Sequence, residues 1–144
     1  YPVAGRPLPP IAALHAALYR AGPFQYAAHE RAAEVAAVSG RVRRLRPYLD
    51  DLAQMAGADV LCVPAEPGRV ERAIRGRNAV LLRGCGALCA GATAGDVDAA
   101  RSLLRKGCTA WLYAREEPGC RPLGQADALI QRLAYRYAYG KRKG

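Results

Sequence analysis

The stretch NAVLLRGCGALCAG, residues 78–91, decides the fold of this chain. Its first half, 78–84, is a short apolar run of the kind that forms a buried strand. A turn flanked by Gly84 and Gly86 follows, and a second apolar run then covers residues 87–91. The pattern predicts two antiparallel strands, with the side chain of Cys85 presented at the turn between them.

Helical and extended patterns alternate along the rest of the chain. Thr93 and Asp96 have the spacing of a capping box, which marks the start of a helix. Because some neighbouring strands look hairpin-like, we expect an α/β fold, a three-layer α/β/α domain with a central mixed, largely antiparallel sheet. Leu81, Leu82, Val80, Leu104 and Trp111 are expected in its core. We expect helices at 10–20, about 31–38, 67–76, 93–113 and 125–137, a short helix or turn at 48–55, and strands at 24–30 and 60–64.

The composition is that of a globular chain with an excess of positive charge. Of 144 residues 51% are hydrophobic, so we expect one domain that is large enough to bury a hydrophobic core. The formal net charge is +10. No apolar run reaches the roughly 20 residues that a membrane-spanning helix needs. The dense basic patches, 41–46 and 140–144, are interpreted mainly as solvated surface, with anion contact as the alternative.

The cysteines and the first residues indicate where the protein works. Five cysteines form an odd set without a paired framework, which favours reduced thiols and a cytoplasmic setting. The opening residues, 1–10, lack the basic and apolar regions of a secretory signal peptide. Cys62, Cys89 and Cys108 are most simply small apolar residues of the core.

Five segments follow one another in an order and with a spacing that carry a family resemblance. They are LHAALYRA (14–21), YAAHERAAEVAAVS (26–39), LDDLAQMAGADVLCVP (49–64), VERAIRGRNAVLLRGCGALCAGAT (70–93) and AARSLLRKGCTAWLYA (99–114). Together they resemble the class II aldolase/adducin family, which includes zinc-dependent fuculose-phosphate aldolases and ribulose-phosphate 4-epimerases. The resemblance implies that residues 1–144 form a single domain that lacks the family's N-terminal helix and first strands.

The resemblance also places a metal site on three positions of this chain. The family's His-x-His pair reads His29-Glu30-Arg31, and its third histidine, which precedes a glycine, reads Cys85. Three neutral imidazoles with an open fourth position let zinc polarise a carbonyl group. Arg31 offers no lone pair and keeps its charge. We therefore expect His29, Arg31 and Cys85 to lie close together without zinc or another cofactor, and Arg31 to bind an acidic partner or a substrate anion.

Other family residues have changed as well. Counting back from His15, the family's Ser-Ser-Glu pattern, which holds phosphate and moves a proton, reads Pro9-Pro10-Ile11 after Leu8. Ile11 cannot transfer a proton. Tyr139 aligns with a C-terminal tyrosine that family members extend into a neighbouring subunit's site as a proton donor, so Tyr139 is a candidate catalytic residue. The resemblance further implies a homo-oligomer, with a tetramer favoured.

These observations favour a class II aldolase/adducin-like protein with a degenerate metal site and no aldolase activity, serving as a scaffold or binding a small anion. One alternative is a metal-dependent sugar-phosphate aldolase or epimerase with an altered site that still uses zinc. A second alternative is a basic nucleic-acid-binding protein. At the site itself, two further interpretations stay open: a replacement metal pair formed by Cys85 and Cys89, and a Cys85 nucleophile with His29 as its base.

Overall fold

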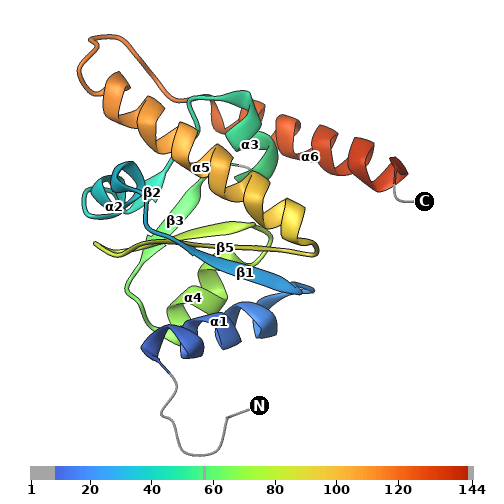
Figure 1. Cartoon of the computed structure of the whole chain (residues 1–144). Coiled ribbons are helices and arrows are strands. Elements are labelled where there is room, and N and C mark those ends of the chain that lie inside the picture. Colours follow the sequence, from blue (N-terminus) through green and yellow to red (C-terminus); the bar gives the residue numbers. More distant parts are fainter. Residues whose placement is uncertain (1–8, 57, 143–144) are drawn as a thin grey trace, which may run out of the picture.

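A computed structural model describes residues 9–56 and 58–142, which form a five-stranded sheet covered by helices on both faces (Figure 1). Leu8, at the start of the pattern discussed above, and residues 143–144 of the basic tail lie outside the described residues. The elements are α1 (Pro10–Ala21), β1 (Tyr26–Glu30), α2 (Ala33–Ser39), β2 (Arg44–Leu45), α3 (Asp50–Ala56), β3 (Val60–Val63), α4 (Pro67–Ile74), β4 (Ala79–Leu82), β5 (Gly86–Gly91), α5 (Ala94–Ala114) and α6 (Gln125–Arg142).

The sheet has the strand order β1-β5-β4-β3-β2. β5 pairs antiparallel with both β1 and β4, and β2 pairs antiparallel with β3, whereas β3 and β4 run parallel. The expected mixed, largely antiparallel sheet is therefore confirmed, together with the hairpin formed by residues 78–91. All six residues of β5 and all four of β4 are buried, which explains why these segments read as continuous apolar runs rather than alternating ones.

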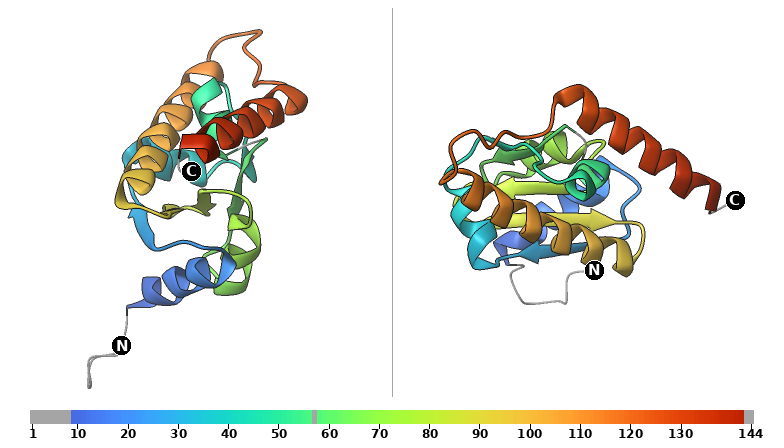
Figure 2. Two further views of the ribbon diagram at one scale, coloured as in Figure 1. Left: turned by 90° about the vertical axis from the view of Figure 1, so that its right-hand side faces the viewer. Right: turned by 90° about the horizontal axis from the view of Figure 1, so that it is seen from above.

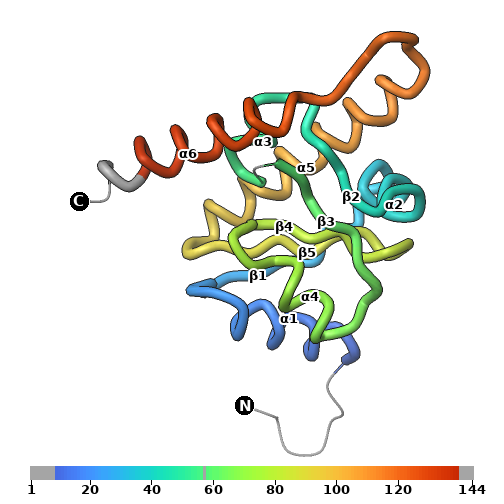
Figure 3. The backbone as a smooth tube through the Cα atoms, turned by 180° about the vertical axis from the view of Figure 1, so that it is seen from behind, coloured from blue at the N-terminus to red at the C-terminus, as the bar shows by residue number. Residues whose placement is uncertain are grey.

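Helices cover both faces of the sheet and complete the three expected layers (Figure 2). On one face, α1 and α4 bury Leu18 and Ile74 against Val80 and Leu88. On the other face, α2, α3 and α5 enclose a second cluster around Leu81. α6 packs mainly on α3 and projects beyond the sheet, as the view from behind shows (Figure 3). Among the described residues, no helix combines the length and apolar character that crossing a bilayer requires.

Three expectations need correction. Trp111 is only partly buried, because it lies toward the end of α5, where the Arg115 guanidinium lies 4.8 Å from its ring centroid. α6 continues past residue 137 to Arg142, since no proline interrupts it. The basic stretch 41–46 contains a strand that sequence patterning missed, β2, whose Leu45 is fully buried while Arg44 faces out. The expected core positions Val80, Leu81, Leu82 and Leu104 are buried, as predicted.

Glu30 is the buried carboxylate that joins the sheet to α5. Only 1% of the residue is exposed, and its oxygens accept bonds from the Ala32 N–H at 2.8 Å, Arg101 Nε at 2.9 Å and Arg105 Nη2 at 2.9 Å. Burial raises the pKa of this carboxyl, but the bonds from Ala32, Arg105 and Arg101 outweigh it and bring the pKa to about 2. Glu30 is therefore ionised in the folded chain throughout the neutral and mildly acidic range.

Replacing Glu30 should change how stability depends on pH. The ordinary pKa of the group is 4.5 and its folded value is about 2, so its stabilising contribution is complete above pH 4.5 and disappears as the pH falls toward 2. We expect Glu30→Gln to lower the free energy of unfolding by roughly 2–4 kcal/mol at pH 7, and the gap from the unmodified chain to shrink below pH 4.5. Urea titrations at several pH values measure this. Glu117→Gln, at an exposed position after α5, is the control, and a gap that stays constant with pH would contradict the role of Glu30.

Candidate functional site

The turn between β4 and β5 presents Cys85 at one end of the sheet. Gly84 and Gly86 have φ values of +70° and +96°, a region that side chains rarely adopt. The Cys85 N–H donates to the Leu82 carbonyl at 2.9 Å and closes the turn. A Cβ on Gly86 would lie 2.2 Å from the Glu30 carbonyl oxygen. Gly84 and Gly86 therefore allow the tight turn, and Gly86 also allows the end of β1 to pack against it. The side chain of Cys85 is exposed.

Ser39, the last residue of α2, holds this turn in place through two hydrogen bonds. Its carbonyl accepts the Gly84 N–H at 3.2 Å, and its hydroxyl oxygen accepts the Gly86 N–H at 3.2 Å. The hydroxyl itself donates to the Ala36 carbonyl, and the Cys62 thiol donates to the Ser39 carbonyl. Ser39 is completely buried. The sequence carried no signal for this role, because the partners are distant in the chain.

His29 contacts the same turn from β1. Its Nε2 lies 2.9 Å from the Cys85 carbonyl oxygen. Since a carbonyl oxygen only accepts, Nε2 carries the proton, and in the neutral ring the one free lone pair is on Nδ1. Burial, followed by repulsion from His29, lowers the pKa of His15 on α1. The two histidines of the chain therefore lie near each other on the α1 side of the sheet.

Arg31 follows directly after β1. Its Cα would lie 3.4 Å from a Cβ placed on Gly86, so its backbone is beside the turn, and its side chain is exposed. The structure thus brings the backbones of His29, Arg31 and Cys85 together at one end of the sheet. In the described part of the chain, no ion pair joins Arg31 to an acidic residue. The adjacent acid, Glu30, points to the opposite face, where Arg101 and Arg105 hold it.

The side chains at this end of the sheet can be compared with the ligand sets of zinc sites. Zinc sites in proteins use at least three protein ligands from imidazole, thiolate and carboxylate groups. Among residues 9–56 and 58–142, no group of three or more His, Cys, Asp or Glu is placed to hold a metal ion. Of the pair Cys85 and Cys89, Cys85 is exposed, whereas Cys89 is fully buried and burial is the main cause that raises its pKa to about 12. His29 bonds the Cys85 carbonyl, so this geometry lends the nucleophile hypothesis no support either.

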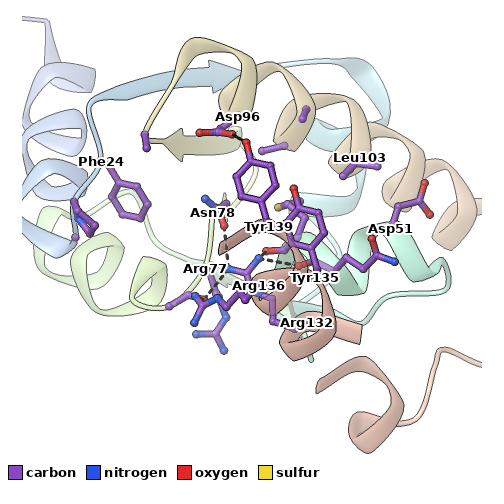
Figure 4. Close-up of a pocket in the computed structure, with 18 of the residues that line it drawn as sticks. Phe24, Asp51, Arg77, Asn78, Asp96, Leu103, Arg132, Tyr135, Arg136 and Tyr139 are labelled. Carbon is purple, nitrogen blue, oxygen red and sulfur yellow. Dashed lines mark hydrogen bonds between the residues drawn. The ribbon is translucent and has the colours of Figure 1, made fainter. Parts of the chain in front are cut away.

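Tyr139 lies at the other end of the sheet. Its hydroxyl donates to Asp96 Oδ1 at 3.2 Å, near the start of α5, and its ring stacks on Tyr135 with centroids 5.5 Å apart. Asp96 lies beside Gly91, the last residue of β5, since a Cβ added to Gly91 would be 2.7 Å from Asp96 Cβ. Cys85 directly precedes the first residue of β5, so the two places are separated by the length of that strand, roughly 20 Å. Within one chain, Tyr139 therefore does not share a site with His29 and Cys85. It lines a cavity of about 470 Å³ beneath α6 (Figure 4).

Comparison with known proteins agrees with this architecture. Residues 3–112 match the family model described as the class II aldolase and adducin N-terminal domain. Comparison with curated protein sequences gave no significant match.

Solved structures share the fold at low sequence identity. L-fuculose-1-phosphate aldolase from Thermus thermophilus is 23% identical with a TM-score of 0.66, over 83% of this chain and 69% of that one. Another L-fuculose 1-phosphate aldolase is 17% identical with a TM-score of 0.79, over 93% and 67% of the two chains. YgbL from Escherichia coli is 20% identical with a TM-score of 0.70, over 90% and 68%.

The two glycines of the turn provide a matched test of its geometry. An added Cβ at Gly84 meets nothing within 4 Å, so Gly84→Ala should cost only backbone strain, about 1–2 kcal/mol. Gly86→Ala adds a clash with the Glu30 backbone carbonyl and should cost about 3 kcal/mol or more. Urea denaturation of both variants measures the difference. Equal losses would mean that the end of β1 is not held against the turn.

Proposed function

The chain belongs to the class II aldolase and adducin family, and from this premise we propose that it carries a degenerate metal site and performs no aldolase chemistry. The end of the sheet that bears His29, Arg31 and Cys85 instead binds a small anion such as phosphate. The supporting observation is the side-chain set at this end, which combines one imidazole, one exposed thiol and one guanidinium without an acidic partner in the described chain.

Charge supports this proposal more strongly than ligand count alone. Two unit charges about 4 Å apart interact by about 4 kcal/mol at an effective dielectric constant of 20, and a divalent ion doubles the repulsion from Arg31. His29 and Cys85 are too few ligands to offset that cost. The same charge attracts an anion, and the guanidinium geometry matches the oxygens of phosphate or carboxylate.

A neighbouring arginine adds positive charge at the end of the sheet that bears Arg31. Arg83, exposed directly after β4, brings a second guanidinium next to Gly84 of the turn. Ile11, which the family resemblance places where relatives carry a catalytic glutamate, is partly buried on α1 and offers no proton.

Assembly into a homo-oligomer, with a tetramer favoured, is the second part of the proposal. The face of α6 that points away from the body carries Leu129, Ile130, Leu133 and Tyr137, which are 51%, 62%, 66% and 67% exposed. A cluster of large apolar side chains on one helix face is typical of an interface between subunits. The overall setting we propose is cytoplasmic, in keeping with five free cysteines.

Variants of Arg31 test the metal site directly. After chelator treatment and incubation with zinc, the unmodified chain should hold well under one zinc per chain. Arg31→His combined with Cys85→His should hold about one, because three imidazoles then meet. Cys85→His alone is the matched control and should stay low, since Arg31 remains. Metal analysis after gel filtration measures this, and none of the variants should cleave a sugar phosphate, because Ile11 is unchanged.

The same proteins test anion binding. Inorganic phosphate should bind the unmodified chain in calorimetry, and Arg31→Gln should weaken binding about tenfold, as expected for one charge-assisted contact. Cleavage of a sugar phosphate by the unmodified chain, lost on treatment with a chelator, would overturn the proposal in favour of the active aldolase or epimerase.

The apolar face of α6 gives the test of assembly. Ile130→Glu combined with Leu133→Glu should convert the oligomer to monomer, because two charges would be buried at the interface. Tyr113→Glu changes a residue that is 73% exposed on α5 and should leave the oligomer intact. Light scattering measures the mass of each variant. A monodisperse monomer for the unmodified chain would refute the assembly.

A further inference from the structure

A cavity of about 470 Å³ lies beneath α6, at the end of the sheet opposite to Cys85. Its walls come from α3, α5 and α6 and from the connections that follow α1 and α4. Figure 4 shows Tyr135 and Tyr139 next to Arg132 and Arg136, with Phe24 to one side and Leu103 to the other. Its volume is in the range of sites for small molecules. No residue discussed for the metal site contributes to it.

Arg132 brings a buried positive charge to the wall of this cavity. Only 8% of the residue is exposed. Its guanidinium donates to the carbonyls of Gln54 at 2.8 Å and Gly76 at 3.2 Å, to the Met55 carbonyl, and to Asn78 Oδ1 at 3.0 Å. All four acceptors are neutral, and in the described chain Nε has no hydrogen-bond partner.

The electrostatic consequence is visible in the pKa of this group. Burial, followed by repulsion from Arg136, lowers the pKa of Arg132 to about 10. A buried cation without a carboxylate partner is costly, because neutral carbonyls recover only part of the lost hydration. The bonds to the ends of α3 and α4 anchor α6, but they leave the positive charge uncompensated.

The other charged groups of the wall do not neutralise it. Arg136 donates to the Gly76 carbonyl at 3.1 Å and is paired with no carboxylate among the described residues, and Arg77 is bound to Asp59 at 2.8 Å. Two carboxylates, Asp51 and Asp96, also line the cavity, and each already interacts with a residue other than Arg132 or Arg136. Asp51 lies 3.9 Å from Lys106, and Asp96 caps α5 and accepts the Tyr139 hydroxyl. The α6 side of the cavity is therefore its positive side.

The remaining wall is mostly apolar. Phe24, Met55, Leu103 and the stacked rings of Tyr135 and Tyr139 surround the space in front of the arginines. Rings of this kind pack against flat apolar groups, and an arginine with spare N–H donors binds carboxylate or phosphate oxygens. Arg136 uses one of its five N–H groups on Gly76, and its side chain is exposed, so it is the accessible donor.

We propose that this cavity binds a small organic anion, a molecule with a flat apolar body and one carboxylate or phosphate group. The anionic group lies against Arg136 and in the field of Arg132, and the apolar body lies between Phe24, Leu103 and the tyrosines. This site is separate from the anion site at Arg31, and neither depends on the other.

Three probes of similar shape test the proposal in calorimetry with the full chain: 2-naphthoate, 1-naphthyl phosphate and neutral 2-naphthamide. Both anions should bind, and 2-naphthamide should bind at least about tenfold more weakly, as a lost charge-assisted contact implies. A preference between the two anions identifies the anionic group. Equal binding of 2-naphthoate and 2-naphthamide, or no binding of either anion at millimolar concentration, would overturn the proposal.

Variants locate the binding and keep it apart from folding. Arg136→Gln should weaken 2-naphthoate about tenfold and leave 2-naphthamide unchanged. Ala99→Trp, at an exposed position lining the cavity, should abolish binding of all three probes while the circular dichroism spectrum and melting temperature stay close to those of the unmodified chain. Arg121→Gln, at an exposed position that does not line the cavity, should bind the probes as the unmodified chain does. Unchanged binding of 2-naphthoate by both Arg136→Gln and Ala99→Trp would place the probe outside this cavity and refute this site.

Discussion

The close approach of Gly86 to the Glu30 carbonyl is the constraint on which the arrangement depends. A side chain at Gly86 would stand 2.2 Å from that oxygen, so β1 can run beside β5 to its end only because this residue has none. With β1 in that place, His29 reaches the Cys85 carbonyl on one face. On the other face, Glu30 reaches Arg101 and Arg105 and ties α5 to the sheet. The absence of a side chain at Gly86 therefore allows both the contact of His29 with the turn and the ion pairs of Glu30.

The hairpin and helices could be predicted from the sequence because their signals are local. Continuous apolar runs marked β4 and β5, and Thr93 with Asp96 forms the expected capping box at the start of α5. β2 was missed because its two residues lie among arginines and their strand partner, β3, is distant in the chain. Trp111 was misplaced because helical spacing gives a direction but not the depth of cover at a helix end.

The candidate site divides in the same way. The resemblance identified His29, Arg31 and Cys85, and the structure brings their backbones together. The roles of Ser39 and Arg132 depend on backbone groups that are distant in the sequence, and a local residue pattern cannot predict such partners. The cavity beneath α6 depends on how a terminal helix crosses α3, which local sequence does not determine.

The shortage of acidic residues links the two ends of the sheet. The chain has 22 lysines and arginines against 12 acidic residues. Three buried or half-buried carboxylates each bind two arginines: Glu30 binds Arg101 and Arg105, Asp59 binds Arg44 and Arg77, and Glu71 binds Arg20 and Arg75. Other arginines donate to neutral carbonyl groups, as Arg46 and Arg132 do, or are exposed, as Arg31 is. Arg31 at one end of β5 and Arg132 with Arg136 at the other form no ion pair with an acidic residue in the described part of the chain. The same imbalance is the common basis of both proposals, an anion site at Arg31 and an organic anion in the cavity beneath α6.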